Sequence, residues 1–167
     1  MRIAFSGAHR TGKTTLVQAL GDALPGYEVI DEPYAALDEE GHDFSDPPTT
    51  EDFEVQLRRS LEIVTAAPAN ALIDRSPLDF VAYLGVSEGD AVDAETLRAA
   101  MGALDLIVLV PIEAPDRIVV AASEDRRLRS AVDEMLSSLV LDDRYGFGVE
   151  VLEVNGRVDA RVSQVLA

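Results

Sequence analysis

Residues 7–14 read Gly7-Ala8-His9-Arg10-Thr11-Gly12-Lys13-Thr14, which satisfies the pattern G-x-x-x-x-G-K-[ST]. The apolar run Arg2–Ser6 comes directly before this stretch and is typical of a buried strand. After it, apolar residues recur at helical spacing at Leu16, Val17 and Leu20. A strand before the pattern and a helix after it form the structural context that this motif requires.

The glycines of this stretch allow the backbone to curl so that successive N–H groups point at phosphate oxygens. The N-terminus of the following helix adds partial positive charge. In such a loop Lys13 would bridge the β- and γ-phosphates, and the Thr14 hydroxyl would hold Mg²⁺. We therefore expect residues 7–14, together with Thr15, to bind ATP or a similar nucleoside triphosphate.

The rest of the chain alternates predicted strands with predicted helices. Further strands are expected at Tyr27–Ile30, Ala71–Ile73, Leu106–Val110 and Val149–Val154. Alternation of this kind indicates a parallel sheet covered by helices, an α/β three-layer sandwich with five strands. No repeat or linker divides the sequence, and residues 1–167 are expected to form one domain.

Local signals set the expected helix ends and loops. Thr49 and Thr50 offer an N-cap for a helix that ends near Pro68. Pro77 is well placed to open the next helix, and Ser123 is the predicted N-cap of a later one. Residues 35–48 are rich in Gly, Asp and Pro, have no periodicity and are predicted to be a mobile surface loop.

The net charge of −17 limits the partners of this chain. Such a charge repels a phosphodiester backbone, so we expect no nucleic-acid partner. The only lysine among 14 basic residues is Lys13, inside the motif.

The chain has no cysteine, no signal-peptide pattern and no apolar run near the ~20 residues that span a bilayer, so a cytoplasmic protein without membrane contact is expected. The oligomeric state, a homodimer included, stays open.

Asp74 ends the third predicted strand and is a candidate ligand of Mg²⁺. Its carboxylate would face the motif if the first and third strands are neighbours. The residue after it is Arg75, whereas motor-type ATPases usually carry a water-activating Glu there. This difference favours transfer to a bound acceptor over hydrolysis. Alternatively, Asp74 and Arg75 only cap the helix that begins at Pro77.

Together, three features resemble the P-loop kinases of nucleosides and nucleotides: deoxynucleoside kinases, thymidylate kinases and the ribosylnicotinamide kinase domain. The stretch around Arg10 is similar to the thymidylate kinase loop. Asp74-Arg75-Ser76 resembles the signature that ends the third strand, and Glu32-Pro33 resembles the pair that ends the second strand. The resemblance implies the strand order 2-3-1-4-5.

The resemblance also implies roles for individual residues. Glu32 would act as the base near the acceptor hydroxyl, and Arg75 would bind the transferred or acceptor phosphate. Equally, Glu32 and its neighbour Asp31 fit ordinary solvated turn residues. Asn155, after the last strand, falls where these kinases contact the adenine base, mainly through the backbone.

Arg126, Arg127 and Arg129 open the helix that follows the fourth strand, where these kinases carry a lid over ATP. Positive charge there could stabilise the transferred phosphoryl group. A basic cluster at a helix start opposes the helix dipole, so packing alone does not explain it. We assign Arg126 to catalysis and Arg127 to the nucleotide. Surface pairing, such as Arg129 with Asp133, is the alternative.

These residues together predict an ATP- and Mg²⁺-dependent kinase of a small-molecule acceptor, a nucleoside or nucleotide. The rival prediction is a nucleotide-hydrolysing or nucleotide-binding switch that acts on a protein partner.

Overall fold

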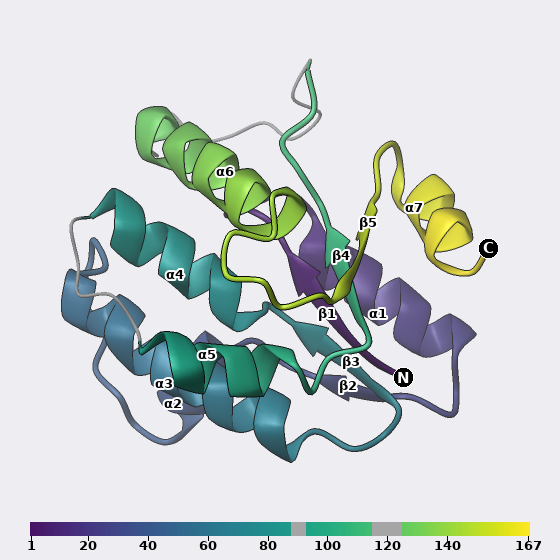
Figure 1. Cartoon of the computed structure of the whole chain (residues 1–167), viewed down its shortest axis with the longest axis horizontal. Coiled ribbons are helices and arrows are strands. Elements are labelled where there is room, and N and C mark those ends of the chain that lie inside the picture. The colour runs from purple at the N-terminus through teal and green to yellow at the C-terminus, as the bar shows by residue number, and fades with distance from the viewer. Residues whose placement is uncertain (88–92, 115–124) are drawn as a thin grey trace.

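The described residues place five parallel strands in one sheet. The computed structural model describes residues 1–87, 93–114 and 125–167. The strands are β1 (Arg2–Ser6), β2 (Glu28–Ile30), β3 (Ala71–Asp74), β4 (Leu106–Leu109) and β5 (Glu150–Glu153). Their order is β2-β3-β1-β4-β5, and each neighbouring pair is parallel (Figure 1). The predicted parallel sheet and its strand order are confirmed.

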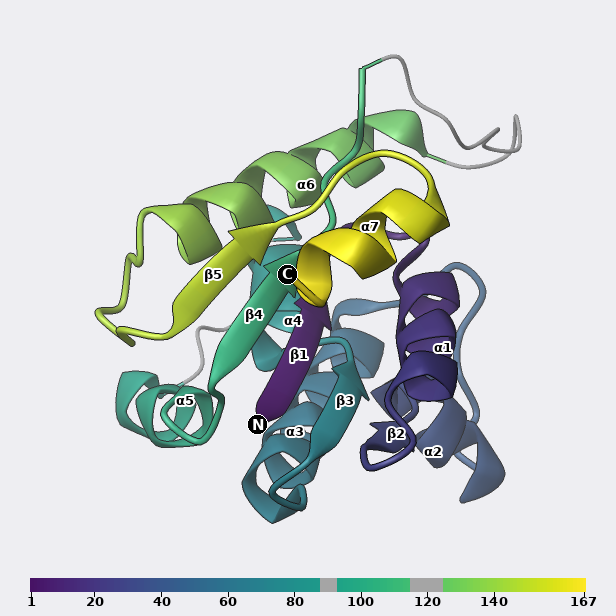
Figure 2. The ribbon, with the colours of Figure 1, turned by 90° about the vertical axis from the view of Figure 1, so that its right-hand side faces the viewer.

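Helices cover both faces of this sheet. They are α1 (Lys13–Ala23), α2 (Pro33–Glu39), α3 (Thr50–Ala66), α4 (Pro77–Val86), α5 (Ala94–Met101), α6 (Arg126–Leu141) and α7 (Val158–Val165). α1 and α7 pack on one face, and α3, α4, α5 and α6 pack on the other (Figure 2). This is the predicted three-layer α/β sandwich. None of the helices in the described ranges combines the length and apolar character that a bilayer-spanning segment needs.

Successive side chains of β1 point to opposite faces of the sheet, so this strand contributes to both hydrophobic cores. Ile3 and Phe5 point into the core beneath α1 and α7, while Ala4 points into the core beneath α4 and α6. All three are buried, and so is the next residue, Ser6. A central parallel strand is covered on both faces and therefore reads as a continuous apolar run.

The two outer strands are less buried than the central ones. β2 exposes Glu28 and Val29, and β5 exposes Glu150 and Glu153. The pattern of β5, with charged ends and a half-buried middle, is that of an edge strand.

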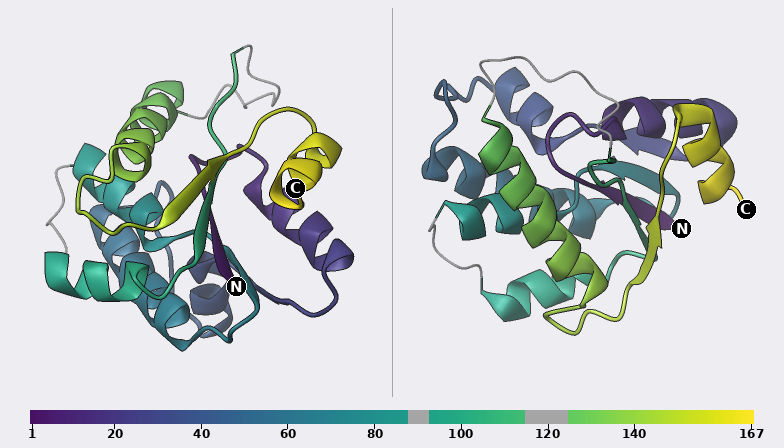
Figure 3. Two further views of the ribbon diagram at one scale, coloured as in Figure 1. Left: turned by 45° about the vertical axis from the view of Figure 1, so that its right-hand side comes forward. Right: turned by 90° about the horizontal axis from the view of Figure 1, so that it is seen from above.

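Parallel pairing brings the segments that follow the strands to one edge of the sheet. The turn after β1, the residues after β3 and the start of α6 meet there (Figure 3). Ligands of open parallel sheets bind at this carboxyl edge, beyond the strand ends.

The predicted loop at residues 35–48 is wrong in its first part, because Pro33–Glu39 forms α2. Pro33 stands at the start of this helix, and good helix formers follow it. Tyr34 stacks on Phe44 with ring centroids 4.4 Å apart, which fastens α2 to the segment beyond it. The Gly and Pro residues that are typical of a loop lie beyond Glu39, so the part of the stretch that forms α2 carries local helix signals.

Two of the predicted helix caps have different outcomes. Thr49 caps α3 as predicted, in a capping box with Asp52. The cap of α6 is Asp125, whose carboxylate accepts hydrogen bonds from the N–H groups of Arg127 and Leu128. The prediction of Ser123 as this cap is wrong, and Ser123 itself lies outside the described residues.

Candidate functional site

The loop between β1 and α1 has the backbone shape of a phosphate cradle. Arg10 and Gly12 have positive φ angles of 54° and 90°. A Cβ atom on Gly7 would lie 2.4 Å from the carbonyl oxygen of Val110, so only glycine fits there. Within the described part of the chain, no side chain caps α1, and its first N–H groups stay available to an anion.

Lys13 lies inside this loop and is buried. Its ammonium donates hydrogen bonds to the carbonyl oxygens of Gly7 at 2.7 Å and Ala8 at 2.8 Å. Burial and, to a lesser extent, the nearby positive charge of Arg75 lower the pKa of Lys13 to about 8. A phosphate group beside the ammonium would favour its charged form further, in the same direction as the carboxylates of Asp79, Asp74 and Glu32.

Two arginines bind the outer side of the same loop. Arg129 of α6 donates from Nε to the carbonyl oxygen of His9 at 2.8 Å and from Nη2 to that of Arg10 at 3.1 Å. Arg161 of α7 donates from Nη1 to the carbonyl oxygen of Thr11 at 2.7 Å. The successive carbonyl groups of His9, Arg10 and Thr11 thus accept hydrogen bonds from arginine side chains.

Among the three arginines of the α6 cluster, Arg129 is the one buried against the loop, while Arg126 and Arg127 are exposed at the helix start. Asp133, the alternative partner of Arg129, accepts from the N–H of Ile112 at 3.1 Å. The charge of Arg129 also acts on Asp133, since it opposes the rise in the pKa of Asp133 that burial causes. Arg129 therefore contributes to the shape of the loop.

Asp74 and Thr14 lie together at the carboxyl edge, since β1 and β3 are neighbours. Asp74 is buried, and burial raises its pKa against the opposing effect of the Thr14 hydroxyl. Its Oδ1 atom has no hydrogen-bond partner among the described residues.

This pair fits Mg²⁺. A carboxylate and a hydroxyl are hard oxygen ligands, and an unpartnered carboxylate oxygen gains from a cation. No group of three or more His, Cys, Asp or Glu side chains with metal-site geometry occurs in the described ranges. Mg²⁺ itself commonly binds through one or two protein oxygens and takes its other ligands from phosphates and water.

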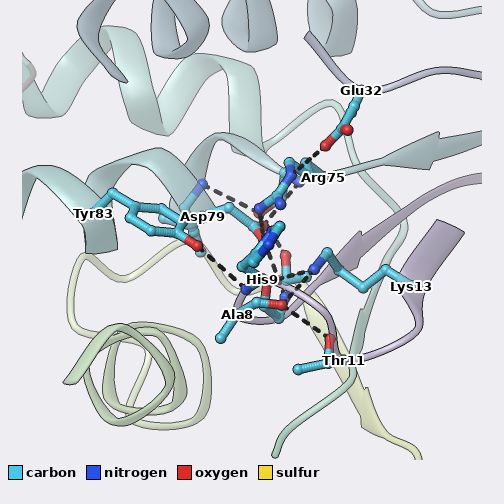
Figure 4. Close-up of polar contacts among 12 residues, drawn as sticks. Ala8, His9, Thr11, Lys13, Glu32, Arg75, Asp79 and Tyr83 are labelled. Carbon is cyan, nitrogen blue, oxygen red and sulfur yellow. Dashed lines mark hydrogen bonds and ion pairs between the residues drawn. The ribbon is translucent and has the colours of Figure 1, made fainter. Parts of the chain in front are cut away.

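Arg75 connects the end of β3 to the end of β2. Its Nε donates to Glu32 Oε2 at 2.7 Å, and its Nη1 lies 3.5 Å from Asp79 Oδ1 (Figure 4). The Arg75 backbone adopts a left-handed conformation, φ 80°, which is uncommon for a side chain of this kind. The structure therefore brings together Glu32 and Arg75, which the sequence links only by resemblance.

Asp79 is a site residue that the sequence reasoning missed. Its buried carboxylate accepts from the N–H of Gly7 at 3.1 Å and from the N–H of Ser76 at 3.1 Å. Ser76 and Asp79 form a capping box on α4, so neither Asp74 nor Arg75 caps this helix. The spacing S-x-x-D before an apolar run is a recognisable signal for that cap.

Tyr83 was also missed. Its hydroxyl oxygen accepts a hydrogen bond from the N–H of His9 at 3.2 Å (Figure 4), and its ring stacks on Phe53 with centroids 4.7 Å apart. Burial raises the pKa of Tyr83. Tyr83 thus links Phe53 of α3 to the loop at His9.

Asn155 is exposed after β5, and both of its backbone groups are already engaged. Its N–H donates to Gln164 Oε1 at 3.2 Å, and its carbonyl oxygen accepts from Gln164 Nε2 at 2.8 Å. A base contact through the backbone of Asn155 would therefore compete with Gln164.

Comparison with known proteins gives a family and a fold. A family model described as "AAA domain" (AAA_28) matches residues 2–161. No curated protein sequence matches the chain.

Solved structures with folds similar to this chain include the following three. A NadR protein in complex with NAD and AMP-PNP superposes with a TM-score of 0.66 at 17% identity and 98% coverage of this chain. The chain spans 48% of the length of that protein. A thymidylate kinase from Candida albicans gives 0.62 at 14% identity, with 98% of this chain and 88% of that chain covered. A deoxyadenosine kinase from M. mycoides with bound dATP gives 0.61 at 15% identity, with 99% and 97% covered.

Proposed function

The chain belongs to the AAA domain family matched over residues 2–161, and from that premise we propose that it is a Mg²⁺- and ATP-dependent kinase of a small-molecule acceptor, a nucleoside or nucleotide. The proposal rests on one observation, the ion pair between Glu32 and Arg75 beside the loop at residues 7–14. This pair puts a carboxylate and a guanidinium beside the place where a terminal phosphate would lie. Residues 1–167 would form a single domain with this activity.

The phosphates of ATP would be bound by the loop. N–H groups of residues 10–15, the Lys13 ammonium and the exposed Arg10 side chain would surround the β- and γ-phosphates. Mg²⁺ held by Thr14 and Asp74 would neutralise charge on these phosphates. Arg126 and Arg127, exposed at the start of α6, would approach the same group from the other side.

Glu32 and Arg75 would act on the acceptor. Arg75 holds the Glu32 carboxylate in place and adds positive charge near the transferred group. The acceptor oxygen bonds to the γ-phosphorus, and the bond from that phosphorus to the β,γ-bridging oxygen breaks. ADP leaves with the bond's electrons, and the hydroxyl proton passes to Glu32.

Arg75 also argues against hydrolysis as the main reaction. It occupies the position after Asp74 where a water-activating carboxylate would stand, and it holds Glu32 in an ion pair. A bound acceptor is then better placed than water to use that carboxylate.

The test is transfer of labelled γ-phosphate from ATP with Mg²⁺ to a panel of nucleosides, nucleotides and small alcohols. Lys13→Ala should abolish transfer, because the loop loses its ammonium group. Glu32→Gln should lower kcat by about 10²–10⁴, the usual effect of removing a general base, while ATP affinity stays within about twofold.

Asp31→Asn is the matched control, since Asp31 is the exposed neighbour of Glu32. It should leave kcat close to that of the wild type. Phosphate release without any acceptor, unaffected by Glu32→Gln, would reject the kinase and favour a hydrolytic switch.

A further inference from the structure

A buried ion pair joins three segments that are far apart in the sequence. Arg161 on α7 donates from Nη1 to the carbonyl oxygen of Thr11 at 2.7 Å and from Nη2 to Glu113 Oε1 at 2.9 Å. The same carboxylate oxygen accepts from the N–H of Gly156 at 2.6 Å. The network thus connects the loop at residues 7–14, the segment after β4 and the turn after β5.

The burial of this pair gives it a fixed geometry. The side chains of Arg161 and Glu113 are only 9% and 14% exposed. A planar guanidinium presents its donors in a rigid fork, so one arginine can hold the carboxylate and the carbonyl oxygen together. Lysine has a single flexible ammonium and lacks this two-point geometry.

The bond to Thr11 controls the direction of an amide. In a trans peptide unit the C=O and N–H groups point in opposite directions. Arg161 holds the Thr11 carbonyl toward α7, so the N–H of Gly12 points to the opposite side, where phosphate would bind. Gly12 itself does not fix the orientation of this peptide, because glycine populates positive φ angles, such as the 90° seen here, about as readily as negative ones.

Apolar contacts already fasten α7 without this pair. Val162 and Val165 pack into the core cluster beneath α1, and α7 lies against α1 in each view (Figure 3). Replacing a buried ion pair by apolar groups is often neutral for stability, so anchoring gives little reason for a charged group here.

We infer that Arg161, oriented by Glu113, is a positioning residue that fixes the Thr11–Gly12 peptide of the phosphate loop and joins this loop to the turn at Gly156. The inference rests on the proposed function, because it concerns how tightly the loop binds a polyphosphate. It predicts an effect on phosphate affinity that is separate from any effect on stability.

The experiment compares Arg161→Met with Val162→Ala, a partly buried neighbour on α7 that packs against the core. Calorimetry measures the affinity of each variant for Mg²⁺·ATP and for Mg²⁺·tripolyphosphate, which has no base. Arg161→Met should weaken both by a similar factor of about tenfold or more, the usual effect of losing a hydrogen bond to a charged group. Val162→Ala should lower Tm and keep tripolyphosphate affinity within about twofold.

Arg161→Lys provides a second variant if Arg161→Met fails to fold. It should weaken tripolyphosphate binding by a smaller factor, because the charge remains and the two-point geometry is lost. Wild-type affinity for tripolyphosphate in a folded Arg161 variant would overturn the inference. The wild-type protein could also bind tripolyphosphate and yet transfer phosphate to no acceptor. That result would overturn the proposed function and leave the inference about Arg161 standing.

Discussion

Lys13 should couple nucleotide binding to proton uptake. Burial first, and the charge of Arg75 second, lower the pKa of Lys13 from 10.5 to about 8 in the nucleotide-free protein. A polyphosphate beside the ammonium stabilises its charged form and should restore at least the ordinary pKa. Nucleotide must then bind the protonated protein, or bind together with a proton.

The size of this effect follows from the pKa of Lys13. At pH 8 about half of the lysine is neutral, so binding should take up about 0.5 proton, and at pH 9 about 0.9 proton. The protonated fraction drops about tenfold between pH 7 and pH 9, so affinity should fall by the same factor, about 1.4 kcal/mol.

The stability of the nucleotide-free protein should change in the opposite direction. The unfolded chain, with its ordinary lysine pKa of 10.5, binds more protons than the folded protein above pH 8. The contribution of Lys13 to the free energy of unfolding should therefore rise with pH between about 8 and 10.5.

Calorimetry with a non-hydrolysable ATP analogue, in two buffers of different ionisation enthalpy, measures the proton uptake. Phosphate groups titrate near pH 6, so they contribute little at pH 8 and 9. Lys13→Arg is the control, because arginine stays charged and should show no uptake. Tight binding by the wild type at pH 9 without proton uptake would refute the argument.

The remaining predictions concern packing and the metal site. Gly7→Ala should destabilise the protein by about 1–3 kcal/mol, since its Cβ would meet the carbonyl oxygen of Val110 at 2.4 Å; an unchanged Tm would contradict this. Phe5→Ala should cost about 3–5 kcal/mol in urea denaturation, because the ring is fully buried; a loss below 1 kcal/mol would show that the core closes around the gap. Asp74→Asn should raise the Tm of the nucleotide-free protein, because burial disfavours the carboxylate, yet weaken Mg²⁺·nucleotide binding about 10–100-fold; a lower Tm would mean that the charge supports the fold.

The sequence predicts those parts of the fold that depend on local signals. The strand at Arg2–Ser6, the helix after it and the cap at Thr49 each follow from neighbouring residues, and the structure has all three. The helix Pro33–Glu39 was missed because it adjoins residues 40–48, whose Gly, Asp and Pro content is typical of a loop.

The site divides in the same way. The loop itself is a contiguous motif, whereas its support comes from residues far along the chain. Arg161 contacts Thr11 across a separation of 150 residues, and Arg129 contacts His9 across 120. Neither arginine carries a sequence signal for this contact, because α6 and α7 reach the loop only when the whole sheet has formed. Asp79 differs, since its capping box is visible in the sequence.

The acidic margins of the sheet bear on how copies of this chain can associate. Glu150 and Glu153 stand at the ends of β5, and Glu28 stands on β2 at the far side. Two molecules that paired antiparallel through β5 would place Glu150 of one strand near Glu153 of the other, and like charges directly opposite repel. The charge on β5 therefore disfavours extension of the sheet from one molecule to the next through this edge.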